Sequence, residues 1–275
     1  MSTRLYRRLC SGRLPRRTLF PILFLAICSA PSLHAQTLRI AAASDLQFVL
    51  PELAAHYEKQ TGAHVALSFG SSGNFFAQIQ NGAPFDLFFS ADLAYPQKLA
   101  ELHFADPASL HVYAVGRLVL WLPPDSPLNP ADGLKTLLDP RIQKIAIANP
   151  EHAPYGRAAV AALKRAGLYG QLEPKLVLGE NISQAAQFVQ SGSAQAGLLA
   201  YSLVSAPAMQ AGKRWEIPSR EYPVVEQAVV VLTTSPDKPT ARAFIAFLNN
   251  PEARATFERF GFLLPSPPAS EKHAP

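Results

Sequence analysis

Two kinds of apolar pattern alternate along the chain from residue 37 onwards. TLRIAAAS at 37–44 is a short apolar run, and DLQFVLPELAAHYEKQTG after it has apolar residues at helical spacing up to Gly62. The same order returns in HVALSFGSSG before NFFAQIQNGAP, and in FDLFFSAD before AYPQKLAELHF. Apolar runs that alternate with helical repeats predict βαβ units and a mostly parallel sheet.

A second set of alternating segments follows the apolar run RLVLWLP and a proline-rich loop. The set reads KIAIANP, RAAVAALKRAGLYG, KLVLGEN, ISQAAQFVQSG and AQAGLLAYS, and it predicts a second α/β unit. PVVEQAVVVLTTS then predicts a long strand that crosses back, and two helical stretches separated near Pro251 follow it. We therefore expect two lobes, the first formed by 36–116 with 227–265 and the second by 117–226. Two crossing segments would join them, and the ligand cleft would lie between them.

The two ends of the chain lack this alternation. Residues 1–35 carry six arginines and no acid, followed by the apolar run LFPILFLAICSA, which predicts a signal peptide cut after Ala35 and export to the periplasm. The last ten residues, 266–275, have no apolar periodicity, so we expect a mobile tail.

Removal of the leader changes the charge and the available chemistry. The full chain has 25 basic and 20 acidic residues, and the leader takes six of the basic ones, which leaves 19 against 20. This balance gives no nucleic-acid footprint. Cys10 and Cys28 both lie in the leader, so the exported chain offers no cysteine nucleophile, cysteine metal ligand or disulfide.

Small and hydroxyl-bearing residues mark four predicted strand-to-helix junctions. They are Ser44 with Asp45, the Gly-Ser-Ser-Gly loop that contains Ser72, Ala-Pro-Tyr-Gly with Tyr155, and Glu-Asn-Ile-Ser with Ile182. Such junctions lie at the carboxyl edge of a parallel sheet, where helix N-termini offer free N–H groups and a positive dipole end. The set predicts a cradle for an anion, although a serine at a helix start is often only an N-cap.

Other chemistry has weaker support in the residues. A serine-hydrolase elbow needs a second glycine where this chain has Asn74, and the seven histidines show no metal-ligand spacing. A secreted enzyme that uses the cleft, with Ser72 or Asp86 in catalysis, stays open as an alternative, but no general base is visible beside them. An iron-binding protein would need clustered tyrosines, which these loops lack.

Several segments occur in an order that resembles a known family. They are AAASDL, FGSSGNFFAQIQNGAPFDLFFSAD, GRLVLW, NPEHAPYGRAA, GENISQA and RFGF. In this order they resemble the periplasmic molybdate-binding proteins, the capture subunits of molybdate ABC transporters. The resemblance implies an α/β, two-lobed type II periplasmic binding protein fold. It also implies a non-enzymatic monomer that binds molybdate or tungstate, without cofactor or bare metal cation, and delivers it to a membrane permease. A binder of sulfate or another oxyanion is the alternative within this class.

The resemblance also assigns residues to the ligand. Its binding serines fall on Ser44 and Ser72, and its backbone donors on Tyr155 and Ile182. Many members have leucine where this chain has Asp45, whose side chain we expect to turn away and cap the helix.

Many members also place a ligand-binding tyrosine in a later strand. That position aligns with Ala200 here, with Tyr201 one residue further on. A shift of one residue reverses the side of a strand, so we expect Tyr201 to face the core. Tyr155 or the Asp45 amide would then supply the missing donor.

Overall fold

The computed structural model describes residues 37–265, which form two five-stranded sheets with helices packed on them. The expected signal peptide, 1–35, and the expected mobile tail, 266–275, lie outside the described residues. Within the described range, no helix is both long enough and apolar enough to cross a membrane.

The first sheet is mixed, and one of its interior strands returns from late in the chain. Its strand order is β2 (His64–Gly70), β1 (Thr37–Ala43), β3 (Leu87–Ser90), β10 (Val225–Val231) and β4 (His111–Gly116). β1 is parallel to both β2 and β3, whereas β10 is antiparallel to β3 and β4. Four of the five strands therefore run in one direction, as the alternation predicted, and only β10 enters the sheet from the opposite direction.

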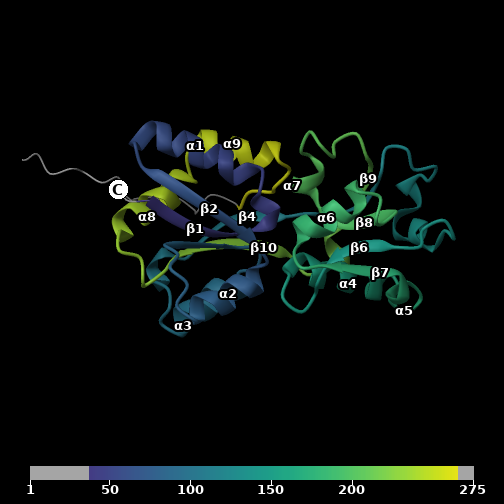
Figure 1. The fold of residues 1–275 in the computed structure, drawn as a ribbon, viewed down its shortest axis with the longest axis horizontal. Helices are drawn as coiled ribbons and strands as arrows, with labels where there is room; N and C mark the ends of the chain where they lie inside the picture. Colours follow the sequence, from purple (N-terminus) through teal and green to yellow (C-terminus); the bar gives the residue numbers. More distant parts are fainter. Residues whose placement is uncertain (1–36, 266–275) are drawn as a thin grey trace, which may run out of the picture. The chain divides into compact units, whose positions relative to one another are not determined.

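Helices cover both faces of this sheet (Figure 1). Alternate residues of β1 point to opposite faces, so Ile40 joins a core cluster on one face and Ala41 a cluster on the other. The Ile40 face is covered by α1 (Val49–Thr61), α8 (Lys238–Phe247) and α9 (Pro251–Arg259). The Ala41 face is covered by α2 (Ser72–Gln80) and α3 (Ala94–Glu101). Both faces are buried, which explains why β1 is a nearly continuous apolar run.

The second sheet has the same mixed design. Its strand order is β7 (Leu176–Gly179), β6 (Ile145–Ala148), β8 (Ala196–Ala200), β5 (Leu118–Leu122) and β9 (Lys213–Glu216). β6 is parallel to β7 and β8, and β5 is antiparallel to β8 and β9. The helices of this unit are α4 (Pro154–Arg165), α5 (Tyr169–Leu172), α6 (Ile182–Gln190) and α7 (Tyr201–Val204). The sequence pattern extended the β8 strand through Tyr201, but the strand ends at Ala200 and Tyr201 begins α7 instead.

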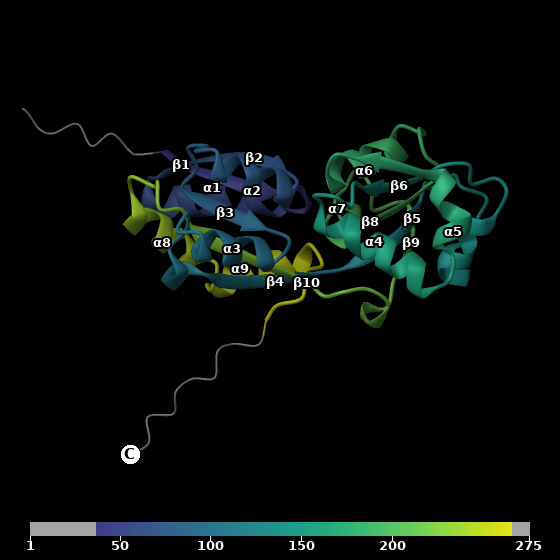
Figure 2. The ribbon, with the colours of Figure 1, turned by 90° about the horizontal axis from the view of Figure 1, so that it is seen from below.

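Two segments connect the sheets (Figure 2). One leads from β4 directly into β5, and the other leads from β9 back to β10. The two segments lie together, because Val225 at the start of β10 pairs with Gly116 at the end of β4. The parallel strands β1, β2, β6 and β7 all lead at their carboxyl ends into short loops and helix starts, which supply the candidate site.

Candidate functional site

Local sequence signals start the helices directly after their strands. Ser71 is the N-cap of α2, where its hydroxyl accepts a hydrogen bond from Asn74 N at 3.3 Å. Asn181 is the N-cap of α6 and accepts from Gln184 N at 3.0 Å. α4 begins at Pro154, whose missing N–H costs nothing at a first helical position. These signals fix where the free N–H groups of the three helices lie.

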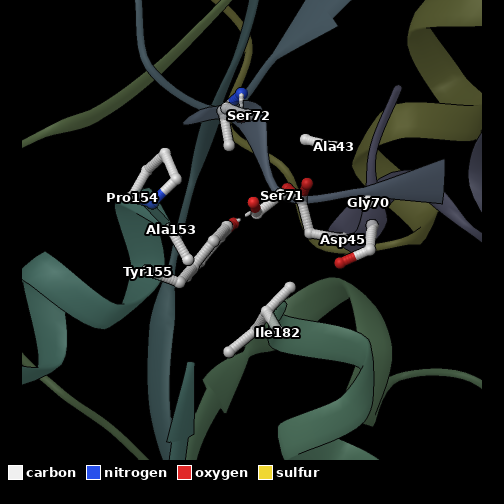
Figure 3. A pocket seen from close by; sticks show the side chains of 11 residues that line it. Ala43, Asp45, Gly70, Ser71, Ser72, Ala153, Pro154, Tyr155 and Ile182 are labelled. Atoms are coloured by element: carbon white, nitrogen blue, oxygen red, sulfur yellow. Dashed lines mark hydrogen bonds between the residues drawn. The ribbon is translucent and has the colours of Figure 1, made fainter. Parts of the chain in front are cut away.

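A small pocket lies where these helix starts meet the end of β1. Its free volume is about 10 Å³, which has room for about one water molecule. Figure 3 shows Asp45, Ser71 and Tyr155 directed toward one space, with Ser72 and Ile182 on opposite sides of it. The pocket is lined by Ala43, Ser44, Asp45, Gly70, Ser71, Ser72, Ala91, Ala153, Pro154, Tyr155 and Ile182. Among the described residues, no lysine or arginine lines it.

The pocket is rich in backbone donors. Ser72 and Ile182 are the first residues of α2 and α6, and Tyr155 is the second residue of α4. N–H groups in the first turn of a helix have no intrahelical partner, and the positive dipole end adds to their attraction for an anion. Three helices of eight or more residues thus direct their N-termini at one cavity, which is suited to bind an anion without a cationic side chain.

The two predicted serine hydroxyls are buried and engaged with the protein. Ser72 Oγ accepts a hydrogen bond from Ala91 N at 3.0 Å. Ser44 Oγ accepts from Ser183 N at 3.3 Å and donates to Asn181 Oδ1 at 3.2 Å. Each hydroxyl therefore has a defined position at the pocket wall, and Ser44 links η1 (Ser44–Leu46) to the start of α6.

Contacts between the α2 loop and the α4 loop close one side of the pocket. Ser71 Oγ lies 2.9 Å from His152 Nδ1, and Gly73 N donates to His152 O at 2.9 Å. A Cβ on Gly73 would lie 2.6 Å from that carbonyl oxygen, so this approach requires glycine. Arg157 Nη2 of α4 also donates to Asp92 Oδ2, after β3, at 2.5 Å. The segments around the cavity are thus held together by direct hydrogen bonds.

The carboxylate of Asp45 lies in the pocket, which corrects the expectation that it caps a helix. No side-chain cap is present at η1, and Asp45 is only 1% exposed. Its Oδ2 accepts hydrogen bonds from Tyr155 Oη at 3.1 Å and from Gln227 Nε2 at 2.5 Å. Its Oδ1 is buried without a hydrogen-bond partner. Donors on α4 and β10 hold the side chain inward, toward the pocket and away from a capping position.

Burial governs the protonation of Asp45. Loss of solvent raises the pKa of its carboxyl group from the usual 3.8 to about 6, while the hydrogen bonds from Gln227 and Tyr155 act in the opposite direction. The folded state therefore binds this proton more tightly than the unfolded chain does. The stability that the protonated form contributes is fully present below about pH 3.8 and is lost as the pH rises through about 6.

The two candidate tyrosines have different surroundings. Tyr155 is buried in the pocket wall with its hydroxyl donating to Asp45, which leaves its amide as the group free for a ligand. Tyr201 does not line the pocket. Its ring packs against the core of the second sheet. The Cζ atom of Arg117 lies 3.7 Å from the centroid of the ring, so the guanidinium stacks on it. Ala200, the aligned position, is buried at the end of β8.

The residues considered for catalysis have structural partners. Asp86 lies outside the pocket, where it accepts hydrogen bonds from Arg39 N at 2.7 Å and Ser235 Oγ at 2.9 Å. His152 pairs with Ser71, yet within residues 37–265 no hydrogen bond joins this histidine to a carboxylate. The same range holds no group of three or more His, Cys, Asp or Glu residues placed to bind a metal ion. The pocket geometry therefore favours binding over catalysis.

The sequence pattern did not predict Gln227 and Tyr113, two residues that position Asp45. Gln227 is buried on β10, and its Oε1 accepts from Tyr113 Oη at 2.8 Å, which turns its Nε2 toward Asp45. A glutamine beside Glu226 in the mostly apolar strand VEQAVVV was the available signal, because a buried amide must find partners. The position of Tyr113 on β4 gave no comparable signal.

Comparison with known proteins places the chain in a class. A sequence model of the family described as bacterial extracellular solute-binding protein matches residues 38–263. The chain belongs to this family. It is accordingly a solute-binding protein and not an enzyme.

Individual relatives make the comparison more specific. The chain is 38% identical over 243 residues to the molybdate-binding protein ModA of Rhodobacter capsulatus, covering 87% of this chain and 94% of the relative. It is 28% identical to ModA of Escherichia coli (strain K12), covering 82% and 88%. The solved periplasmic molybdate-binding protein of Azotobacter vinelandii matches with a TM-score of 0.79 at 36% identity, over 83% of this chain and 100% of that chain. This likeness confirms the expected type II periplasmic binding protein fold.

Proposed function

We propose that the chain is a periplasmic protein that captures molybdate, and also tungstate, and delivers it to the membrane permease of an ABC importer. The observation that carries the proposal is the pocket at three helix N-termini, lined by neutral donors and without a lysine or arginine. The molybdate-binding relatives from Rhodobacter and Azotobacter support molybdate as the oxyanion. No cofactor is needed for this role, and a monomer is sufficient for it.

The ligand would be held through its oxygens rather than through the molybdenum atom. Ser72 would offer a hydroxyl donor, and Ser44 would do so by turning its hydrogen from Asn181 Oδ1 to the ligand. Tyr155 and Ile182 would offer backbone N–H donors. A hydrogen bond to a charged group contributes roughly 1.5–3 kcal/mol. About six or seven such bonds would contribute roughly 9–21 kcal/mol, against an association cost of roughly 4–15 kcal/mol.

The same proposal gives the two sheets the role of lobes. The first lobe would consist of 36–116 with 227–265, and the second of 117–226. The β4–β5 and β9–β10 connections would then act as the hinge, and opening about it would admit the ligand, since the closed pocket has space for about one water. A binder of sulfate or another oxyanion is the alternative that the donor set also supports.

Isothermal titration with four oxyanions tests the proposal. Molybdate and tungstate should bind with similar, tight affinity, whereas sulfate and phosphate should bind at least about tenfold more weakly, a difference of about 1.4 kcal/mol. Sulfate binding within tenfold of molybdate would favour the alternative, and no binding of any oxyanion would reject both.

Tyrosine substitutions test which groups contact the ligand. Tyr201→Phe should leave molybdate affinity unchanged, because this ring stacks on Arg117 outside the pocket. Tyr155→Phe keeps the amide and removes a hydroxyl that donates to Asp45 and not to the ligand. Molybdate affinity should therefore fall by less than about tenfold, which is the loss expected when one charge-assisted hydrogen bond to the ligand is removed. Titration of both variants with molybdate gives the answer. A loss well above tenfold for Tyr201→Phe would mean that the tyrosine of the related proteins has been assigned incorrectly here.

A further inference from the structure

One carboxylate oxygen in the pocket has no partner. Asp45 lines the cavity at 1% exposure, and its Oδ1 is buried without a hydrogen bond. Its Oδ2, in contrast, accepts from both Tyr155 and Gln227. Buried polar atoms nearly always have a hydrogen-bond partner. An unpaired oxygen in a ligand pocket therefore indicates that a group of the bound ligand supplies the missing hydrogen bond.

An ionised carboxylate and an oxyanion cannot form a hydrogen bond with each other, because neither has a proton to donate. Both offer only lone pairs, and two like charges within hydrogen-bond reach in a buried site repel strongly. When two such groups share a site, one of them holds a proton, because a single proton converts the repulsion into a hydrogen bond. The other donors in the pocket wall are N–H and O–H groups, and none of them relieves this repulsion.

Resting on the proposed function, we propose that Asp45 contacts the ligand and holds a proton in the complex. One proton from solvent would lie between Oδ1 of Asp45 and a molybdate oxygen. Binding would thus take up one molybdate and one proton together, and the only covalent change would be the new O–H bond.

The surroundings of Asp45 allow this proton and assign it to Oδ1. Burial already raises the pKa of the carboxyl group to about 6, close to neutral. Gln227 keeps Oδ2 occupied, since its own Oε1 is fixed by Tyr113. Tyr155 and Tyr113 are the titratable groups that face Asp45 from α4 and β4, and burial raises both of their pKa values well above the usual range. α6 has no titratable residue, and the tyrosine of α7, Tyr201, lies outside the pocket.

Calorimetry on the wild-type exported chain tests the proposal directly. Titration with sodium molybdate near pH 8, in buffers with different ionisation enthalpies, should report uptake of about one proton per molybdate. The dissociation constant should rise about tenfold per pH unit between about pH 7 and about pH 8.5. Molybdate binding without proton uptake, and without this slope, overturns the inference and leaves the proposed function standing. Failure of the wild type to bind any oxyanion overturns both.

A matched pair of variants assigns the proton to its residue. Asp45→Asn places a permanent N–H donor where the protonated carboxyl would stand, so molybdate should still bind, with no proton uptake and an almost flat pH profile. Asp86→Asn removes another buried carboxylate of the first sheet, outside the pocket, and should keep both the uptake and the slope. Thermal melts establish that each variant is folded. Undiminished proton uptake in Asp45→Asn would overturn the assignment to this residue.

Discussion

Replacing Gly156 with alanine is expected to displace the start of α4 and to weaken molybdate binding severely. The added Cβ would lie 2.2 Å from Ala148 O and 2.8 Å from Pro150 N, both of them backbone atoms that cannot rotate away. Overpacking of this kind costs up to about 3 kcal/mol. The displaced helix start also carries Tyr155, whose amide we assign to the ligand.

Thermal melts and titration measure the two parts of this effect. A loss of about 3 kcal/mol lowers the melting temperature by about 6–12 °C in a chain of this size. Gly170→Ala is the control, since nothing lies within 4 Å of its added Cβ. If Gly156→Ala melted and bound like the control, the close approach of α4 to the end of β6 would be wrong.

The double substitution Ser44→Ala with Ser72→Ala is expected to produce the largest loss of affinity among the side-chain changes. Each hydroxyl contributes roughly 1.5–3 kcal/mol to a charged ligand, so the pair should weaken molybdate binding by about 10²–10⁴-fold if the effects add. Titration of the double variant and of both single variants measures this.

The hydrogen bond of Ser72 adds a stability effect that the sequence did not predict. Its Oγ accepts from Ala91 N, so alanine leaves that buried N–H unpaired at a cost of about 1–3 kcal/mol. Ser109 is a matched control, because its buried Oγ accepts from Val231 N at 2.9 Å outside the pocket. Ser109→Ala should lose stability but not affinity. Wild-type affinity in the double variant would remove both serines from the proposed site.

The sequence predicted the parts of the pocket that depend on local order along the chain. Ser44, Ser72, Tyr155 and Ile182 each follow a strand and open a helical turn, and such junctions meet at one edge of a sheet. The structure brings all four to one cavity. Whether they bind the ligand stays a prediction, which the serine and tyrosine variants test.

The parts that were missed depend on contacts between distant segments. The donors that hold Asp45 inward lie 110 and 182 residues away along the chain, so no local pattern could place its side chain. The direction of β10 likewise depends on the path by which the chain returns. β9 was missed for a local reason, since three of its four residues in Lys-Arg-Trp-Glu are charged and give no apolar run.

Because β10 lies between β3 and β4, the first sheet cannot be completed until the chain has been delivered as far as Val231. All the strands of the second sheet come from residues 118–216, so that sheet has every strand it needs earlier. During synthesis or translocation from the N-terminus, β4 therefore lacks its sheet neighbour β10 until all strands of the second sheet have emerged. The pocket draws its wall from residues of both sheets as far along the chain as Ile182, so it cannot be complete until that part of the chain has been delivered.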